Sequence, residues 1–232
     1  MAESERSIVL LSGGVDSTAA LMREARAGID SYALTVNYGQ SHAQELWSAK
    51  MVAGHFGVRQ EVIDVPMHQF VRSNLIGHGA LTLEESRQTP GVSPYYVPNR
   101  NMVLLSLAMA WADSEGISRV VFACNADDYR LFPDCRDGFF VSLGGAWGRE
   151  RLDLNVTIST PFIGKRKHEI ISEFPDAPWG LTWSCYQPVK GPAKNPREST
   201  WLACGTCDAC ELRRDSFDAA GVRDPVRMIG DN

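Results

Sequence analysis

The sequence predicts an α/β fold built on a doubly wound, mainly parallel sheet. Short apolar runs alternate with segments of helical periodicity, a pattern typical of strands that helices cover on both faces. With 44% apolar and 22% charged residues, the 232-residue chain suits one globular domain with a small appendage. The composition changes from Trp183 onward, where Cys, Pro and Gly become frequent. We therefore expect a sheet domain over residues 1–180 and a small tail over residues 181–232 that packs on it.

The first part of the chain predicts three strands separated by two helices. Residues 7–11 (SIVLL) are an apolar run typical of a buried strand, and residues 17–27 have helical periodicity. Residues 31–38 (SYALTVNY) predict the second strand. Residues 42–56 place their apolar side chains on one helical face and end at a glycine, so they predict the second helix. Residues 59–65 (RQEVIDV) predict the third strand.

The remainder of the chain continues the alternation after a long connection. Residues 66–98 are mixed and rich in Gly, Pro and Ser, and a loop of this length is usually functional or partly disordered. Further strands are expected at residues 119–124 and 155–161. Further helices are expected at residues 101–114, 165–174 and 208–220.

Charge and composition limit the classes of function. The net charge of −5 argues against broad nucleic-acid binding, which needs a basic face. The N-terminal stretch has an acidic head and a very short apolar run, unlike a signal peptide, and no run approaches the roughly 20 apolar residues of a membrane span. Six cysteines without a secretory segment favour metal ligands or reactive thiols in a reducing compartment. We expect a cytoplasmic protein without a membrane partner.

A glycine pair follows the first strand, in the stretch LLSGGVDSTAALM. Gly13 and Gly14 allow close backbone approach, so successive N–H groups can point at phosphate oxygens, and the next helix directs its positive end at the same anion. A kinase-type loop carries a lysine after its second glycine, but Val15 and Asp16 stand here instead. A loop that grips pyrophosphate while Asp16 holds Mg²⁺ leaves the α-phosphate of ATP open to attack. The pattern therefore predicts adenylation, against the alternative of a simple glycine turn.

Four cysteines in the tail have the spacing of a metal site, C-x18-C-x2-C-x2-C. Four soft thiolate ligands suit tetrahedral Zn²⁺, and a filled site of this kind is structural because it leaves no position for water. An iron–sulfur cluster and a redox pair are the alternatives. Cys124 falls in an expected buried strand and is interpreted as a small core residue. The predicted ligands are Cys185, Cys204, Cys207 and Cys210.

Several separated segments resemble one family. SGGVDS after the first strand is similar to the pyrophosphate-loop superfamily of adenylating ligases and tRNA-thiolating enzymes. NYGQSH at 37–42, YVPNRNMVLLSLA at 96–108, NADDYRLFPDCRDGF at 125–139, STPF at 159–162 and the cysteine tail resemble the 7-cyano-7-deazaguanine synthase family. The resemblance implies an adenine nucleotide alpha-hydrolase-like, Rossmann-like fold and a homodimer. It also implies an ATP-dependent ligase that converts 7-carboxy-7-deazaguanine and ammonia into a nitrile through an adenylated acid and an adenylated amide.

The resemblance also implies roles for particular residues. It assigns ATP with Mg²⁺ to the glycine loop and zinc to the four tail cysteines. Arg100 and Asn101 have the alternative of merely capping the following helix, Asp134 and Arg136 that of a surface pair, and Lys165 that of a solvated helix face. The implied ATP site is Leu11, Ser12, Gly13, Gly14, Val15, Asp16, Ser17 and Thr18. The implied catalytic residues are Asp16, Arg100, Asp134, Arg136 and Lys165, and the implied substrate contacts are Tyr38, Gln40, Asn101, Asp128 and Cys135.

Three departures from the family pattern leave the acceptor open. Asn99 stands where the family usually has Gly, Arg130 and Leu131 replace its usual small residues, and the spacer between Cys185 and the next cysteine is longer. A divergent member could transfer the activated deazaguanine to another acceptor than ammonia. A tRNA-thiolating enzyme, with Cys124 or Cys135 carrying sulfur, is a second possibility, and a zinc-clasped binding protein without activity is a third.

Overall fold

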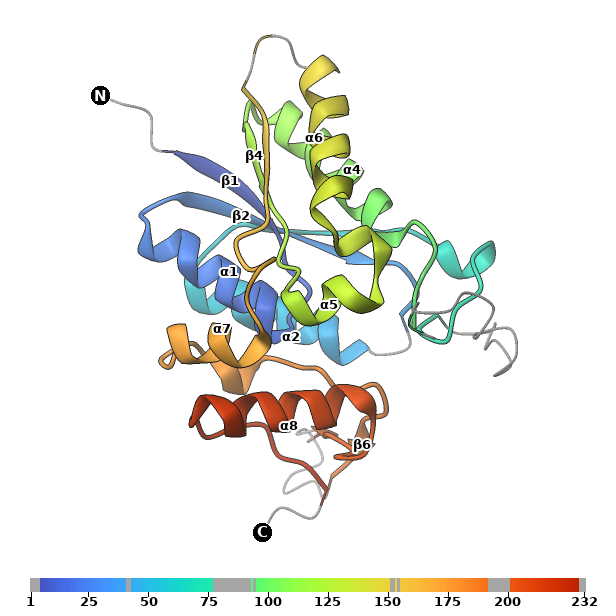
Figure 1. Ribbon diagram of the computed structural model, residues 1–232, viewed down its shortest axis with the longest axis vertical. Coiled ribbons are helices and arrows are strands. Elements are labelled where there is room, and N and C mark those ends of the chain that lie inside the picture. The colour runs from blue at the N-terminus through green and yellow to red at the C-terminus, as the bar shows by residue number, and fades with distance from the viewer. Residues whose placement is uncertain are drawn as a thin grey trace.

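The computed structural model describes residues 5–40, 43–76, 93, 95–150, 153, 155–191 and 201–229, and its core is one parallel sheet (Figure 1). Five strands pair in the order β3-β2-β1-β4-β5, and each neighbouring pair is parallel. This order, with β1 in the middle, confirms the predicted doubly wound α/β fold. The strands are β1 Arg6–Leu10, β2 Asp30–Asn37, β3 Gln60–Asp64, β4 Arg119–Val121 and β5 Thr157–Ser159.

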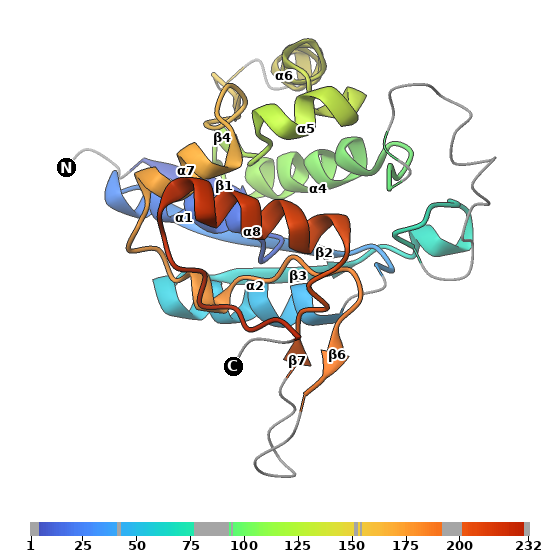
Figure 2. The same ribbon diagram turned by 60° about the horizontal axis from the view of Figure 1, so that its bottom comes forward.

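Side-chain alternation along β1 explains the two layers of helices. Ile8 and Leu10 belong to one hydrophobic cluster, whereas Val9 and Leu11 belong to another on the opposite face. The first cluster includes residues of α4 (Arg100–Ser114) and α6 (Asp137–Glu150). The second cluster includes residues of α1 (Val15–Arg26), α2 (Ala43–Phe56) and α7 (Lys167–Glu173). Figure 2 shows the sheet between these two sets of helices.

Two helices between β4 and β5 were not predicted. The short α5 (Ala126–Leu131) begins with a capping box, in which the Asn125 side chain and the Asp128 carboxylate each bond the other's backbone N–H. The longer α6 contains four glycines, which lower its intrinsic helix propensity. Its Phe140 and Trp147 are buried against the sheet, so tertiary packing stabilises the helix that local propensity did not indicate.

Some predicted boundaries were wrong in ways that affect the site. The strand predicted to reach residue 124 ends at Val121, so Cys124 lies beyond the strand. The helix predicted from Lys165 begins two residues later, at Lys167, and Lys165 precedes it in a turn. The predicted 66–98 connection contains a 3-10 turn, η1 (Met67–Gln69), but residues 77–92 and 94 lie outside the described part of the chain.

The tail packs on the sheet domain through its helix, α8 (Asp208–Ala220), whose bounds match the prediction. Phe217 of α8 joins the cluster formed by α1 and α7. Arg213 is only 2% exposed. Its guanidinium donates two hydrogen bonds, of 2.7 and 2.9 Å, to the Asp224 carboxylate and one of 2.9 Å to Thr182 Oγ1. Before α8, the chain forms a 3-10 turn, η3 (Trp179–Leu181), and two short strands that pair antiparallel, β6 (Val189–Lys190) and β7 (Trp201–Leu202). The spacer residues 192–200 lie outside the described residues.

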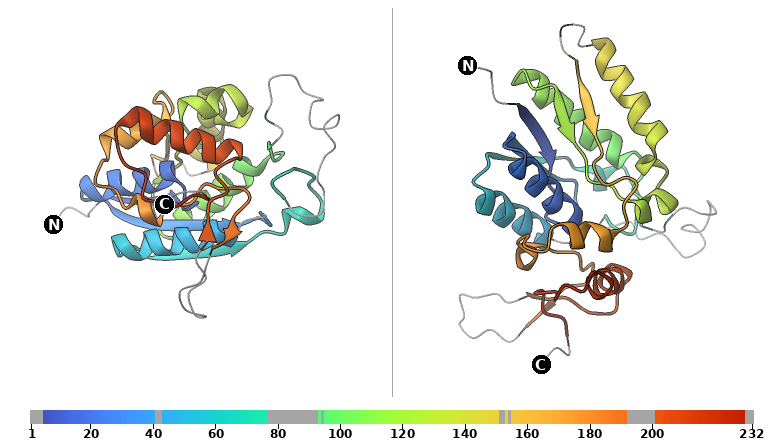
Figure 3. Two further views of the ribbon diagram at one scale, coloured as in Figure 1. Left: turned by 90° about the horizontal axis from the view of Figure 1, so that it is seen from below. Right: turned by 60° about the vertical axis from the view of Figure 1, so that its left-hand side comes forward.

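The tail lies at the end of the molecule where the parallel strands have their carboxyl ends (Figure 3). A backbone hydrogen bond joins the tail to the glycine loop directly, because Trp183 N–H donates to the carbonyl of Gly13 at 2.9 Å. The tail therefore contacts the glycine loop.

Candidate functional site

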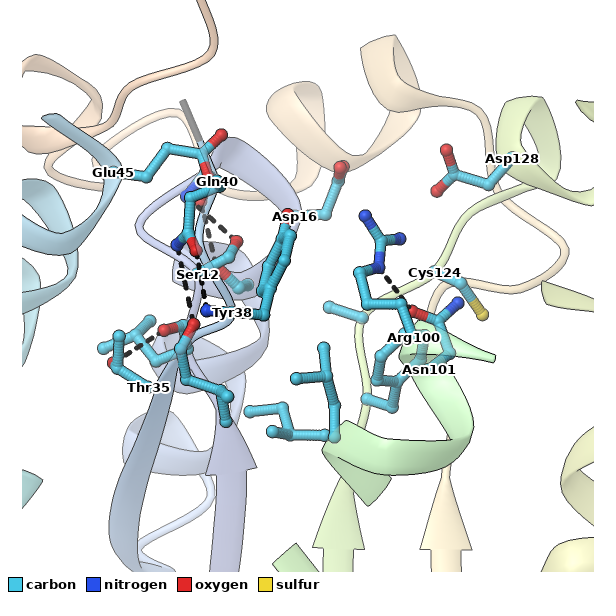
Figure 4. Close-up of a pocket in the computed structure, with 18 of the residues that line it drawn as sticks. Ser12, Asp16, Thr35, Tyr38, Gln40, Glu45, Arg100, Asn101, Cys124 and Asp128 are labelled. Atoms are coloured by element: carbon cyan, nitrogen blue, oxygen red, sulfur yellow. Dashed lines mark hydrogen bonds between the residues drawn. The ribbon is translucent and has the colours of Figure 1, made fainter. Parts of the chain in front are cut away.

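A cavity of about 230 Å³ opens at the carboxyl ends of β1, β2 and β4 (Figure 4). Ligands of doubly wound sheets bind at this edge, outside the strand ends. Leu10 and Leu11 line the cavity from β1 and the residue after it, Leu34 and Val36 from β2, and Cys124 from the segment after β4. Apolar strand ends therefore form the floor, and polar side chains from loops and helix starts form the walls.

The glycine loop forms one wall. Gly13 has φ of 83°, and a Cβ atom placed on it would lie 2.5 Å from the backbone nitrogen of Ala49, so α2 packs directly on the loop. Ser12 Oγ accepts from Gly14 N–H at 3.3 Å and lies 3.1 Å from Ser17 Oγ. Of the eight residues predicted to bind ATP, Gly13, Val15 and Thr18 lie outside the cavity lining. The five that line the cavity are Leu11, Ser12, Gly14, Asp16 and Ser17.

Lys167, to which the sequence analysis gave no role, forms an ion pair with a residue that follows the glycine loop. Lys167 Nζ forms an ion pair with the Asp16 carboxylate, and its side chain is only 14% exposed. Neither Lys167 nor Lys165, the predicted catalytic lysine, belongs to the cavity lining, but only Lys167 pairs with a lining residue; the Lys165 side chain is 42% exposed and pairs with Glu173. Burial raises the pKa of Asp128 to about 6, although Lys167 opposes the shift. The Asp16, Lys167 and Asp128 side chains thus form a charged group beside the glycine loop.

A second polar group comes from the start of α4. Arg100 Nε donates to Asn101 Oδ1 at 3.1 Å, and Asn101 Nδ2 donates to the Cys135 sulfur at 3.5 Å. The Arg100 guanidinium carbon lies 5.8 Å from the ring centre of Tyr38. Burial raises the pKa of Tyr38 against the opposing effect of Arg100, so its hydroxyl is protonated at neutral pH. Gln40 fixes this end of β2, because its Oε1 accepts from Tyr38 N–H at 2.9 Å.

The predicted residues in PDCRD separate in space. Cys135 lines the cavity and is 4% exposed. Asp134 is buried outside the cavity lining; the backbone N–H of Asn101 bonds its carboxylate, and Arg100 lies close enough to oppose the rise in pKa that burial causes. Arg136 is exposed, donates to the Tyr129 carbonyl at 3.3 Å and lies over the Tyr129 ring. Asp134 therefore supports the start of α4, and Arg136 faces the surface.

The four tail cysteines come together as a possible metal centre. Their sulfur atoms all lie within 4.8 Å of one another, which suits one tetrahedral ion with metal–sulfur bonds of about 2.3 Å. Backbone N–H groups of Gln187 and Cys204 donate to the Cys185 sulfur at 3.3 and 3.2 Å. Burial raises the pKa of the Cys185 and Cys210 thiols, whereas N–H donors of Thr206 and Cys207 outweigh burial at Cys204 and lower its pKa to about 6. The arrangement of the four sulfur atoms can hold one metal ion.

Comparison with known proteins identifies the family. The family model described as queuosine biosynthesis protein QueC matches residues 6–221. The chain belongs to the QueC family. A 7-cyano-7-deazaguanine synthase from Cupriavidus metallidurans is 39% identical over 233 residues, covering 97% of each chain. Another from an Azoarcus species is 38% identical over 98% of each. Among solved structures, an NMN synthetase from Francisella tularensis aligns with a TM-score of 0.49 at 15% identity, covering 95% of this chain and 79% of that one.

The structure explains one departure from the usual QueC-family pattern. Asn99, where the family usually has Gly, precedes α4 with φ of 55° and ψ of 15°, in the left-handed region. Glycine adopts this conformation freely, and Asn tolerates it better than most other residues. The substitution therefore keeps the backbone turn that delivers Arg100 and Asn101 to the cavity.

This position allows a prediction about α4. Asn99→Val should cost roughly 1–3 kcal/mol, because a β-branched residue is strained at positive φ. Asn99→Gly should fold with a stability within about 1 kcal/mol of the original chain. Urea unfolding of the two variants measures the difference, and equal stabilities would contradict the left-handed conformation at Asn99.

Glu45 and Tyr186 are among the cavity residues of this QueC-family chain to which no role had been assigned, and the sequence held a weak signal for each. Glu45 lies in the first turn of α2, just after the NYGQSH segment. Tyr186 follows the metal-site residue Cys185 directly, and its ring centre lies 5.0 Å from that of Tyr95. Phe132 also lines the cavity, and it lies in the 125–139 segment that carries the family resemblance. The five predicted substrate contacts, Tyr38, Gln40, Asn101, Asp128 and Cys135, all line the cavity.

Within the described residues, the helices are too short or too polar to cross a membrane.

Proposed function

We propose that this chain is an ATP-dependent ligase that converts 7-carboxy-7-deazaguanine and ammonia into 7-cyano-7-deazaguanine. The relatives that match it over nearly their whole length carry the name of this synthase. The observation that carries the proposal is one cavity in which a lysine-free glycine loop faces a separate polar group around Arg100. The glycine loop suits the phosphates of ATP, and the polar group around Arg100 suits a planar heterocycle with a carboxylate.

The loop side would activate the substrate. The N–H groups of the loop and the hydroxyls of Ser12 and Ser17 would hold pyrophosphate, and Lys167 would neutralise charge on the leaving phosphates. Among the described residues, the buried Asp16 Oδ1 has no hydrogen-bond partner, which suits a ligand for the Mg²⁺ that accompanies ATP. The α-phosphate would then be open to a substrate oxygen. Adenylation of the acid prepares it for ammonia, and adenylation of the resulting amide prepares the loss of its oxygen as AMP.

The opposite side would bind the base. Arg100 and Asn101 can donate hydrogen bonds to its oxygen atoms, while Tyr38 and Gln40 close the end of the cavity. Asp128, with its raised pKa, lines the cavity and would lie close to the phosphates, since Lys167 and Asp16 are its charged neighbours. Asp134 would act as a positioning residue for Asn101. Of the predicted catalytic residues, Asp16 and Arg100 remain candidates for direct contact, and Lys167 takes the part proposed for Lys165.

We further propose that the four cysteines bind Zn²⁺ in a closed, structural site. Four thiolates and no neutral ligand suit zinc, and complete coordination leaves no catalytic position. The chain is proposed to act in the cytoplasm as a homodimer, with residues 1–180 holding ATP and residues 181–232 forming the zinc-binding tail. Its acidic net charge favours small-molecule substrates over a nucleic acid.

One observation bears on tRNA thiolation as a second candidate. Cys124 and Cys135 both line the cavity, where a sulfur-carrying residue would have to lie. However, the hydrogen bond between the two thiols and their burial raise the pKa of Cys135 far above its ordinary value. A protonated thiol is a poor nucleophile, so the ligase is the better assignment.

Pyrophosphate release with 7-carboxy-7-deazaguanine, measured with and without ammonium, tests the proposed function. We expect release to depend on the carboxylate substrate, and mass spectrometry to detect first the amide and then the nitrile when ammonium is present. Release of pyrophosphate with a product other than amide or nitrile would instead identify another acceptor. No release with this substrate would exclude the ligase.

A further inference from the structure

A carboxylate on the loop side of the cavity was given no role in the proposed function. Glu45 lies in the first turn of α2, and its backbone carbonyl would be 2.6 Å from a Cβ atom on Gly13, so the turn packs against the glycine loop. Its side chain lines the cavity together with Ser12 and Asp16. Figure 4 shows it above Gln40, across the cavity from Arg100. Glu45 therefore lies beside the place where the loop would present the α-phosphate.

Among the described residues, no hydrogen bond or ion pair explains the position of the Glu45 carboxylate. No hydrogen bond or ion pair joins it to another residue in the described ranges, whereas Asp16 and Asp134 each have one. A carboxylate that loses water without gaining a partner costs free energy, and such groups occur at functional sites. The charged and titratable groups that face it come from other elements: Tyr38 after β2, Arg100 of α4, Asp16 of α1 and Tyr186 of the tail.

These surroundings give Glu45 an unusual protonation equilibrium. Burial raises its pKa to about 7, and Arg100 limits the rise. Burial also raises the pKa of Tyr38 and of Tyr186, so both phenols are neutral near pH 7. Glu45, on the loop side of the cavity, can thus gain and lose a proton at neutral pH, as an efficient general base requires.

The proposed reaction needs such a base. Nitrogen reaches the enzyme at neutral pH mainly as ammonium, which has no lone pair with which to attack carbon. One proton must leave ammonium before the nitrogen lone pair forms the C–N bond and the C–O bond to AMP breaks, with AMP leaving with the electron pair. The ammonia so bound then loses a second proton to give the amide.

We propose that the Glu45 carboxylate binds the ammonium ion and takes the first of these protons. The step is balanced: ammonium and carboxylate become ammonia and carboxylic acid, and the acid returns its proton to solvent after AMP leaves. Arg100, across the cavity, favours the deprotonated form of Glu45 by its charge. This role rests on the proposed ligase function, because it concerns the nucleophile of that reaction.

The test compares two nucleophiles in the Glu45→Gln variant. Hydroxylamine is largely unprotonated at neutral pH and traps an acyl-adenylate as a hydroxamate without a general base. With 7-carboxy-7-deazaguanine and ATP at pH 7, we expect amide formation from ammonium to fall roughly 100-fold, the usual scale for loss of a general base. Hydroxamate formation should remain within about threefold of the original enzyme. Glu45→Asp, which keeps a carboxylate, should recover part of the ammonium reaction.

The pH profile supplies an independent readout. In the original enzyme, the ratio of amide to hydroxamate rate should rise through about pH 7 as Glu45 loses its proton. In Glu45→Gln this inflection should disappear, leaving only the rise due to free ammonia in solution. Equal losses with both nucleophiles, or a raised KM for the carboxylate substrate alone, would overturn the role and make Glu45 a base-binding residue. An original enzyme that forms neither product overturns the ligase function itself.

Discussion

Lys167→Met is expected to slow adenylation of the carboxylate substrate on the order of 100-fold or more, the usual scale for removing a group that stabilises developing charge. Lys167 pairs with Asp16 at the mouth of the glycine loop, and Asp16 and Asp128 hold its pKa above the ordinary value although burial acts in the opposite direction. The lysine is therefore charged when ATP arrives. Without it, the pyrophosphate leaving group loses its cation. Pyrophosphate release at saturating substrate measures the effect.

Lys165→Met is the matched control, because it removes the same charge two positions away. Its ammonium pairs with Glu173 outside the cavity lining, so adenylation should remain within about threefold of the original enzyme. Both variants should keep their fold, which thermal unfolding checks. A large loss in Lys165→Met together with a small loss in Lys167→Met would reverse the assignment and restore the role predicted from the sequence.

Local patterns predicted the parts of the site that lie where strands end. Buried apolar runs located the strands within two or three residues, and parallel strands bring their carboxyl ends to one edge. The glycine loop after β1 was predicted from its local pattern and Tyr38 after β2 from the family resemblance, and both line the same cavity. The four cysteines were predictable for a similar reason, since three of them lie within seven residues of chain.

The other site residues could not be placed from the periodicity of the sequence, because their positions depend on the three-dimensional structure. The choice between Lys167 and Lys165 depends on where α7 begins. Two positions along a helix differ in direction by more than half a helical turn, so an error of two residues in the start of the helix changes which side chain faces the site. The family pattern put Asp134 and Arg136 in one motif, but a 3-10 turn and the start of α6 point them in different directions. Glu45 carries no motif of its own. Only the packing of α2 on Gly13 places it in the cavity.

Cys207→Ser is expected to lose the metal and to lower the thermal stability of the whole chain. Its thiolate would be one of four ligands, and structural zinc in small domains contributes binding energy of about 10 kcal/mol or more. A loss of roughly 3 kcal/mol of that energy would lower Tm by about 6–12 °C in a chain of this size. Activity should fall as well, since the residues on either side of Cys185 contact the site: Trp183 bonds the glycine loop and Tyr186 lines the cavity.

Cys124→Ala is the control for this experiment, because it removes a buried thiol far from the metal centre in the chain. It should keep one equivalent of zinc, and its Tm should fall less than that of Cys207→Ser. Metal analysis by mass spectrometry and thermal unfolding of both variants decide between the alternatives. Detection of iron with labile sulfide in the original protein would show that the four cysteines hold an iron–sulfur cluster instead of zinc. A full equivalent of zinc in Cys207→Ser, with an unchanged Tm, would show that the thiolate does not bind the ion and that the tail is stabilised by α8 packing alone.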